Sequence, residues 1–208
     1  MANEKLFLID ICGTIYRSNT TFDFMEFWFS DVRWFNRLML IKKHKTVGFI
    51  NAIIFRIFGL DLIRSYVISH LKGLTEHQLK EMTEKFYDSF LSQVINSNVM
   101  EIINTKREAG YRLVIVSATL DCIAKEVAMK LNILEQFSSE LEYKNGICTG
   151  RLKTDWLSSK LKNLQNRNVD LSNIEVITDN YDDTDIIGVS VHAYLVQYEK
   201  NKINGLVA

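Results

Sequence analysis

The segment Lys5–Ile15, with the sequence KLFLIDICGTI, constrains the fold more than any other part of the chain. Four apolar residues run directly into Asp10, and such an uninterrupted run is typical of a parallel strand buried on both faces. The carboxyl end of such a strand lies at the edge of an open α/β sheet, where ligands bind. An acid there is costly to bury unless it is paired, binds a metal or takes part in chemistry. Asp10 could otherwise cap the next turn.

Length and composition narrow the class of protein. With 208 residues and 47% hydrophobic content, the chain can form a sizeable core. Lysine plus arginine equals aspartate plus glutamate at 25 each, so net charge does not indicate a nucleic-acid partner. The three cysteines, at 12, 122 and 148, have no metal-ligand spacing and leave an odd thiol, which favours a reducing compartment. With no signal-peptide pattern, we expect a cytoplasmic protein.

The pattern of apolar residues divides the chain into two parts. From Thr20 to about Gln93 it has helical spacing, with a capping box formed by Thr75 and Gln78. Outside this block, strands and helices alternate, and Asn145-Gly146 marks a hairpin. The predicted strands are 6–9, 112–116, 137–143, 147–152, 174–178, 186–189 and 193–196, and the predicted helices are 98–108, 121–131 and 155–165.

This alternation predicts an α/β fold with a doubly wound, Rossmann-like parallel sheet. We expect residues 1–15 and 96–208 to form this core domain, and residues 16–95 to form an inserted α-helical cap over the edge where the acids meet.

Polar residues follow several predicted strands. The first strand ends in Asp10, the second in Ser117-Ala118-Thr119, and the one at 174–178 in Asp179-Asn-Tyr-Asp182-Asp183. Together with a lysine near the start of the preceding helix, these segments resemble the four motifs of the haloacid dehalogenase superfamily. Leu71-Lys-Gly-Leu-Thr-Glu and Glu142-Tyr-Lys-Asn-Gly resemble its phosphoserine-phosphatase-like branch, which has a helical cap at this insertion point.

The resemblance implies a Mg²⁺-dependent phosphohydrolase acting on a small phosphorylated compound. Asp10 would be the nucleophile that carries an aspartyl-phosphate. Mg²⁺ would be held by Asp10, Asp179 and the backbone carbonyl of Cys12. The remaining expected site residues are those that bind the phosphate or orient the lysine and water: Gly13, Thr14, Ser117, Ala118, Lys160 and Asp183.

Simpler interpretations of these residues stay open. Ser117 could only cap a helix, and the acids from 179 onward could form a solvated loop. Lys160 fits the position of the motif lysine best, with Lys153 and Lys162 as alternatives.

Cys12 departs from the family motif, which has a second aspartate here that protonates the leaving group and activates water. Its loss would typically slow the reaction about 10²–10⁴-fold. A slow phosphohydrolase is therefore one hypothesis. The others are a degenerate member that binds a phosphorylated ligand or a protein partner, and a non-phosphatase reaction such as dehalogenation or carbon–phosphorus cleavage.

The first part of the predicted cap is rich in aromatic and basic residues. Its basic residues are Arg33, Arg37, Lys42, Lys43 and Lys45. The segment could be a small bundle with a solvated basic face, or a surface for an amphiphilic phosphate or an anionic membrane. Its longest charge-free run, Thr46–Phe55, is far below the roughly 18 residues that span a bilayer.

Overall fold

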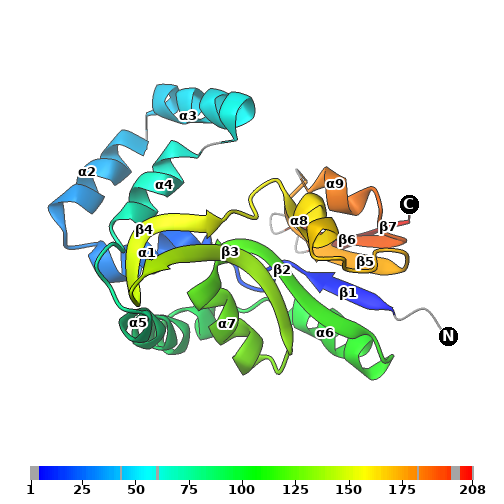
Figure 1. Ribbon diagram of the computed structural model, residues 1–208. Coiled ribbons are helices and arrows are strands. Elements are labelled where there is room, and N and C mark those ends of the chain that lie inside the picture. The colour runs from blue at the N-terminus through cyan, green and yellow to red at the C-terminus, as the bar shows by residue number, and fades with distance from the viewer. Residues whose placement is uncertain (1–4, 43, 60, 182, 198–201, 208) are drawn as a thin grey trace.

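The computed structural model describes residues 5–42, 44–59, 61–181, 183–197 and 202–207, and only the backbone at Phe58 and 202–207. It is built on a seven-stranded sheet in the order β4-β3-β2-β1-β5-β6-β7 (Figure 1). The strands are β1 Leu6–Ile9, β2 Arg112–Leu120, β3 Glu135–Lys144, β4 Ile147–Thr154, β5 Ile174–Thr178, β6 His192–Gln197 and β7 Lys202–Val207. β1, β2, β3, β5 and β6 run parallel, whereas β4 and β7 pair antiparallel at the two edges. The predicted doubly wound α/β sheet is confirmed.

Strand β1 lies at the centre of the sheet and is buried on both faces. Leu6 and Leu8 belong to one apolar cluster, with residues of α8 (Lys160–Asn166) and α9 (Thr184–Ile187). Phe7 and Ile9 belong to the other, with residues of α6 (Ser97–Glu108), α7 (Asp121–Lys130) and the helices inserted after β1. Burying side chains of this size stabilises the fold by about 1.5–3 kcal/mol each. The apolar run of β1 therefore reflects two packed faces.

Five α-helices follow β1 and precede α6. They are α1 Thr20–Phe29, α2 Arg33–Lys42, α3 Lys45–Phe58, α4 Leu62–Ser69 and α5 Glu76–Ser89, and a 3₁₀ turn η1 follows at Leu91–Gln93. The structure assigns no strand among the described residues of this block. Phe24 of α1 packs edge-on against Phe86 of α5, with ring centroids 5.4 Å apart. Thr75 and Gln78 form the predicted capping box at the start of α5.

Three predictions about the second half of the chain need correction. The segment 186–189 is not a strand, because the N–H groups of Ile186 and Ile187 donate to the carbonyl of Asp183 and form the short helix α9. A short apolar run does not distinguish a strand from a buried helix. The helix predicted from residue 155 begins at Lys160, and strand β7 was not predicted.

The longest of the described helices, α3 and α5, have 14 residues each, whereas a membrane-spanning helix needs about 20. Among the described residues, no single helix combines the necessary length and hydropathy. One bent pair, Lys45–Ile57 with Leu62–Ser69, meets them together, by length and composition only.

Candidate active site

The carboxyl ends of β1, β2 and β5 bring the predicted polar residues to one edge of the sheet. Ile9 pairs with Ile115 of β2 on one side and with Ile177 of β5 on the other. Asp10, Ser117 and Asp179 therefore meet, as expected from parallel strands in register. They line a cavity of about 430 Å³, together with Cys12, Ala118, Leu157, Ser158, Lys160, Asn180, Tyr181 and Asp183.

Lys160, the first residue of α8, lies between two carboxylates. Its Nζ is 3.1 Å from Oδ1 of Asp10 and 2.6 Å from Oδ2 of Asp183, and all three residues are buried. Burial disfavours the charged ammonium, but the two carboxylates outweigh it and raise the pKa of Lys160. By contrast, Lys153 lies 3.7 Å from Glu140 and Lys162 is exposed. Of the three candidate lysines, Lys160 is thus the one that contacts Asp10.

Asp183 is fixed by two further groups. Its Oδ2 accepts a hydrogen bond from the Thr178 hydroxyl at 2.8 Å, and its Oδ1 accepts one from the Asn180 amide at 3.3 Å. Asp182, which belongs to the same sequence motif, lies outside the described residues. Asp183 is therefore placed to orient Lys160.

Asp179 approaches Asp10 across the Gly13-Thr14 turn. The Thr14 hydroxyl lies 3.2 Å from Oδ1 of Asp179 and 3.5 Å from Oδ2 of Asp10, and it accepts the Asp179 backbone N–H at 2.9 Å. Gly13 has φ of +70°, and a Cβ there would lie 1.9 Å from Oδ2 of Asp179. Only glycine therefore allows this approach. Burial and the charge of Asp10 raise the pKa of Asp179 to about 6.

Cys12 faces the same cavity, and its thiol is hydrogen-bonded within the loop. Sγ donates to the Ser18 carbonyl at 3.3 Å, and the Gly13 N–H donates to that same carbonyl at 3.0 Å. Burial and the charge of Asp10 raise the Cys12 pKa to about 12, so the thiol is protonated at neutral pH. A group with this pKa is a poor general acid and base at neutral pH.

Ser117 and Thr119 connect the sheet edge to the first inserted helix. The Ser117 hydroxyl is 3.2 Å from the Thr119 hydroxyl, which is 2.6 Å from that of Thr20 at the start of α1. Burial raises the pKa of Asp10, and the nearby charge of Lys160 offsets this effect only in part. Ser117 therefore links the cavity at Asp10 to the start of α1 through Thr119.

Comparison with known proteins identifies the family. The model of haloacid dehalogenase-like hydrolases matches residues 7–187. The chain belongs to this family. No curated protein matches the chain in sequence.

Solved structures of this hydrolase fold share it at low sequence identity. A protein of unknown function from Bordetella pertussis Tohama I has a TM-score of 0.67 and 15% identity over 89% of this chain and 86% of the other. A phosphoserine phosphohydrolase-like protein from Francisella tularensis subsp. tularensis SCHU S4 has a TM-score of 0.61 and 16% identity over 91% of this chain and 85% of the other. A phospho-aspartyl intermediate analogue of phosphoserine phosphatase has a TM-score of 0.57 and 18% identity over 90% of this chain and 83% of the other.

Arg64 of α4 lies next to the cavity at Asp10, where it contacts the backbone of Ala118, and sequence reasoning missed it. Its guanidinium donates to both carboxylate oxygens of Asp155 at 2.8 and 2.7 Å, and to the Ala118 carbonyl at 2.6 Å. Arg64 is buried on the same helix face as Val67, Ile68 and Leu71. An arginine in register with an apolar helix face is the signal that could have revealed it. It anchors the helical block beside Ser117.

The donor set of the hydrolase fits a hard divalent cation. Three carboxylates, from Asp10, Asp179 and Asp183, line the cavity, and among its described lining residues Lys160 is the only cation, so negative charge is in excess. Among the described residues, no group of three or more His, Cys, Asp or Glu side chains could by itself hold a metal. Two carboxylates completed by a backbone carbonyl and waters are the ligands that Mg²⁺ accepts.

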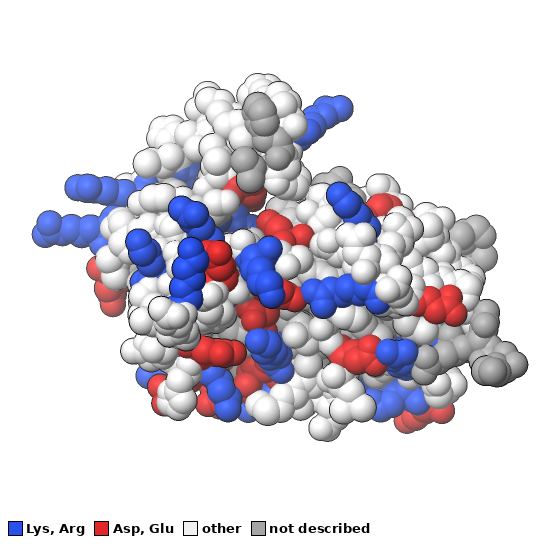
Figure 2. Space-filling view, viewed as in Figure 1, with Lys and Arg blue, Asp and Glu red and all other residues white. Residues whose placement is uncertain are grey.

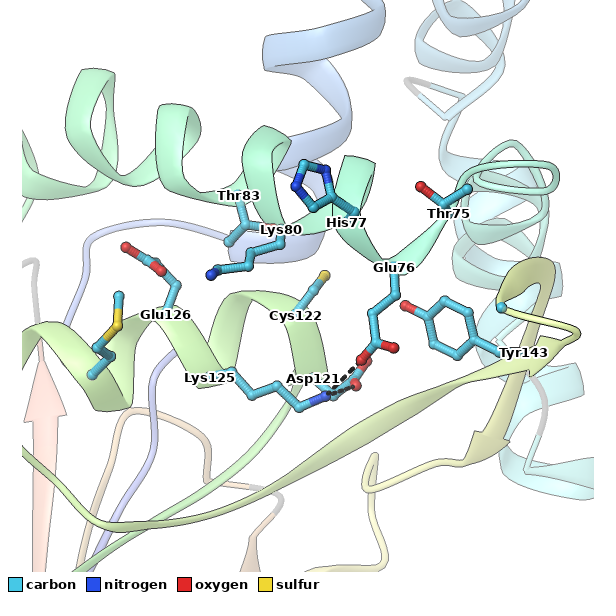
Figure 3. Close-up of a pocket in the computed structure, with 12 residues that line it drawn as sticks. Thr75, Glu76, His77, Lys80, Thr83, Asp121, Cys122, Lys125, Glu126 and Tyr143 are labelled. Atoms are coloured by element: carbon cyan, nitrogen blue, oxygen red, sulfur yellow. Dashed lines mark hydrogen bonds and ion pairs between the residues drawn. The ribbon is translucent and has the colours of Figure 1, made fainter.

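A second cavity of about 540 Å³ lies between α5, α7 and Tyr143 of β3 (Figure 3). Figure 3 shows Lys125 pointing to Asp121 and Glu76, at 2.9 and 4.0 Å. The Cys122 thiol faces this cavity, and burial raises its pKa to about 12. A thiol protonated in this way is a poor nucleophile.

Proposed function

We propose that this protein is a Mg²⁺-dependent phosphohydrolase that acts on a small phosphorylated compound through an aspartyl-phosphate on Asp10. The observation that supports this most is the buried row of charges in which Lys160 lies 3.1 Å from Asp10 and 2.6 Å from Asp183. Such a row places a nucleophile beside a positive charge that can bind the phosphate. The phosphoserine phosphatase among the similar structures is consistent with this chemistry.

Each residue has a role in two displacements at phosphorus. A carboxylate oxygen of Asp10 forms a bond to phosphorus, and the bond from phosphorus to the leaving-group oxygen breaks. Water then attacks the phosphorus of the aspartyl-phosphate, releases inorganic phosphate and restores Asp10. Ser117, Thr14 and the backbone at Gly13 and Ala118 contact the phosphate, and Lys160 offsets its charge.

The cation would be held by Asp10, Asp179 and the carbonyl of Cys12. When bound, Mg²⁺ supplies positive charge between two anions that would otherwise repel each other. Helices α1 to α5, within residues 16–95, would act as the cap, and Arg64 would hold it against the core.

Cys12 limits the reaction. Its thiol is engaged with the Ser18 carbonyl and replaces the carboxyl group that would give a proton to the leaving group and take one from water. Hydrolysis should therefore favour leaving groups that depart without a proton, such as aryl or acyl phosphates. The second displacement should be slow for every substrate, because water lacks a general base.

The deciding experiment restores the missing carboxyl group. Cys12→Asp should raise Mg²⁺-dependent hydrolysis of an alkyl phosphate by about 10²-fold or more. With an aryl phosphate, Cys12→Asp should accelerate the first displacement less, because an aryl leaving group departs without a proton. The matched control is Cys12→Ser, which restores no carboxyl group and should give no such gain. The Asp10→Asn change should remove activity in either background.

The Cys12 substitution also supports a second candidate function, binding of a phosphorylated ligand without turnover. A cation that binds only the folded state raises the melting temperature by mass action. If Cys12→Asp folds, is stabilised by Mg²⁺ in a manner lost in Asp179→Ala, and still hydrolyses no phosphate, the binding function is correct and the hydrolase proposal is wrong.

A further inference from the structure

Helices α2 and α3 form a basic segment with no acidic residue. Between Asp31 and Asp61 the sequence contains no aspartate or glutamate and six basic residues. They are Arg33, Arg37, Lys42, Lys43, Lys45 and Arg56, of which Lys43 lies outside the described residues. We call residues 32–58 the α2–α3 lobe. Its charge differs sharply from the neutral balance of the whole chain.

The lobe exposes an apolar stripe along α3. Phe49, Ile50, Ile53 and Ile57 are 66%, 55%, 42% and 65% exposed. Their spacing places them on one helical face. The partly buried residues of α3, which include Val47, Asn51 and Ile54, lie on the face toward the rest of the protein. The stripe is therefore an apolar face without a partner in the described chain.

Helix α2 also exposes apolar side chains, with Leu40 and Ile41 63% and 50% exposed. Beside them is a hollow of about 550 Å³, which is lined by Arg33, Trp34, Arg37, Leu38, Ile41 and Tyr66. Trp34 is held there by stacking on His70, with ring centroids 3.5 Å apart. Apolar side chains and arginines thus line the same hollow beside α2.

The basic residues of the lobe have little internal compensation. Within the described chain, no ion pair involves Arg33, Arg37, Lys45 or Arg56. Lys42 contacts the Phe22 ring, 3.6 Å from its centroid. Figure 2 shows a largely uncharged upper surface at the position of α3, with basic side chains projecting at its margins.

We propose that the α2–α3 lobe docks on the surface of a lipid bilayer that contains anionic phospholipids. An exposed apolar helix face flanked by lysine and arginine is the arrangement that inserts at the headgroup boundary. Each basic residue near an anionic surface adds attraction. A second copy of the chain fits less well, because two lobes of the same charge would repel each other.

The lobe would lie on the bilayer rather than cross it. In the described chain no single helix meets the requirements of a span, and the one pair that meets them together, Lys45–Ile57 with Leu62–Ser69, is bent by 97°. This proposal does not depend on the phosphohydrolase proposal, because docking requires neither Asp10 nor Mg²⁺.

The test is co-sedimentation of the full chain with vesicles, with and without Mg²⁺. We expect binding to vesicles of phosphatidylcholine mixed with phosphatidylglycerol, and at least about tenfold weaker binding to pure phosphatidylcholine. Binding should weaken as salt is added, because salt screens exposed charges. Activity on a soluble aryl phosphate without vesicles is recorded in parallel, so that the two proposals fail separately.

Matched variants separate the lobe from general effects. Phe49→Glu and the pair Arg33→Glu with Arg37→Glu should each reduce vesicle binding by about tenfold or more. Leu134→Glu replaces an apolar residue that is 100% exposed outside the lobe, and Lys144→Glu with Lys162→Glu makes the same charge change elsewhere. These controls should bind as the wild type does.

Several results would overturn the proposal. They are equal binding to neutral and anionic vesicles, an equal loss in the control variants, or no binding by a protein whose circular dichroism shows it to be folded. A dimer in sedimentation equilibrium that Phe49→Glu dissociates, without vesicle binding, would assign the lobe to a second copy instead.

Discussion

The edge of the sheet around Asp10 and the α2–α3 lobe both concentrate charged side chains, but those at the sheet edge are buried and those in the lobe are exposed. At the sheet edge, Lys160 is buried and contacts Asp10 and Asp183. In the lobe, the charges are exposed and the apolar residues of α3 remain uncovered. Burying charges is tolerated only with partners, whereas exposed charges need none. The sheet edge therefore holds its charges paired inside the protein, whereas the lobe leaves its charges and apolar side chains open to the surroundings.

The largest expected effect is the loss of activity when the Asp10 carboxylate is removed without a change in the shape of the site. Asp10→Asn removes the nucleophile with almost no change in size, so hydrolysis of an aryl phosphate should fall by at least about 10³-fold. Steady-state assays in Mg²⁺ measure this, and circular dichroism establishes that the variant is folded. Retention of more than about a tenth of the activity would exclude Asp10 as the nucleophile.

The next largest effect concerns the buried ammonium group of Lys160. Lys160→Met leaves Asp10 and Asp183 without their shared partner, and breaking a buried ion pair costs about 3–5 kcal/mol. Urea unfolding should show this loss in the free energy of unfolding. The control, Lys162→Met, is exposed on the same helix, and should change the stability by less than about 0.5 kcal/mol. Equal losses in both variants would contradict the special role of Lys160.

A third test uses pH at the opposite end of β5. Burial would raise the pKa of Glu175, but hydrogen bonds from Lys106 at 2.5 Å and Tyr111 at 2.6 Å outweigh it and lower the pKa. A depressed pKa gives stability that is present above the unfolded value of about 4.3 and is lost as the pH falls through the folded value. Lys106→Met should therefore reduce the loss of stability on acidification below about pH 4.3.

Melting curves recorded across this acidic range give the comparison. The matched control is Lys80→Met, whose lysine lies 3.6 Å from Glu84 on the exposed surface of α5. That control should keep the wild-type slope. An unchanged slope in Lys106→Met would show that the pair does not lower the Glu175 pKa.

The smallest expected effect is the change in stability when an exposed residue of the lobe is replaced. Phe49 is exposed, so Phe49→Ser should change the free energy of unfolding by less than about 0.5 kcal/mol. Phe86→Ser, in the packed interface of α1 and α5, should cost at least about 3 kcal/mol. Denaturant unfolding of both variants decides this. A large loss in Phe49→Ser would mean that the stripe packs within the protein.

Local sequence patterns predicted most of the core, for identifiable physical reasons. The apolar run before Asp10, the Thr75–Gln78 capping box and the Asn145-Gly146 hairpin each use short-range geometry, and the structure contains all three. The segment 186–189 misled because its apolar residues suit a strand or a helix, and the Asp183 carbonyl that starts α9 lies outside the apolar run.

Site residues that lie at strand ends were predictable from the sequence. Residues placed by contacts between distant segments were less so. Asp10, Ser117 and Asp179 follow from parallel strands in register. Arg64 contacts Asp155 and Ala118, residues far away in sequence, and no local pattern indicates such partners. That Lys160 rather than Lys153 or Lys162 lies beside Asp10 depends on where α8 begins, and the sequence left this open.

The central claim is that Asp10 forms an aspartyl-phosphate whose hydrolysis is slow because Cys12 supplies no general base. Rapid mixing of the protein and Mg²⁺ with an excess of p-nitrophenyl phosphate tests it directly, combined with acid quenching and mass spectrometry of the peptide that contains Asp10. The account predicts a burst of about one nitrophenolate per protein and a phosphoryl group on Asp10. In Cys12→Asp, the burst should shrink as the second displacement accelerates. Steady turnover with neither a burst nor phosphorylated Asp10, in the wild type, would contradict the account.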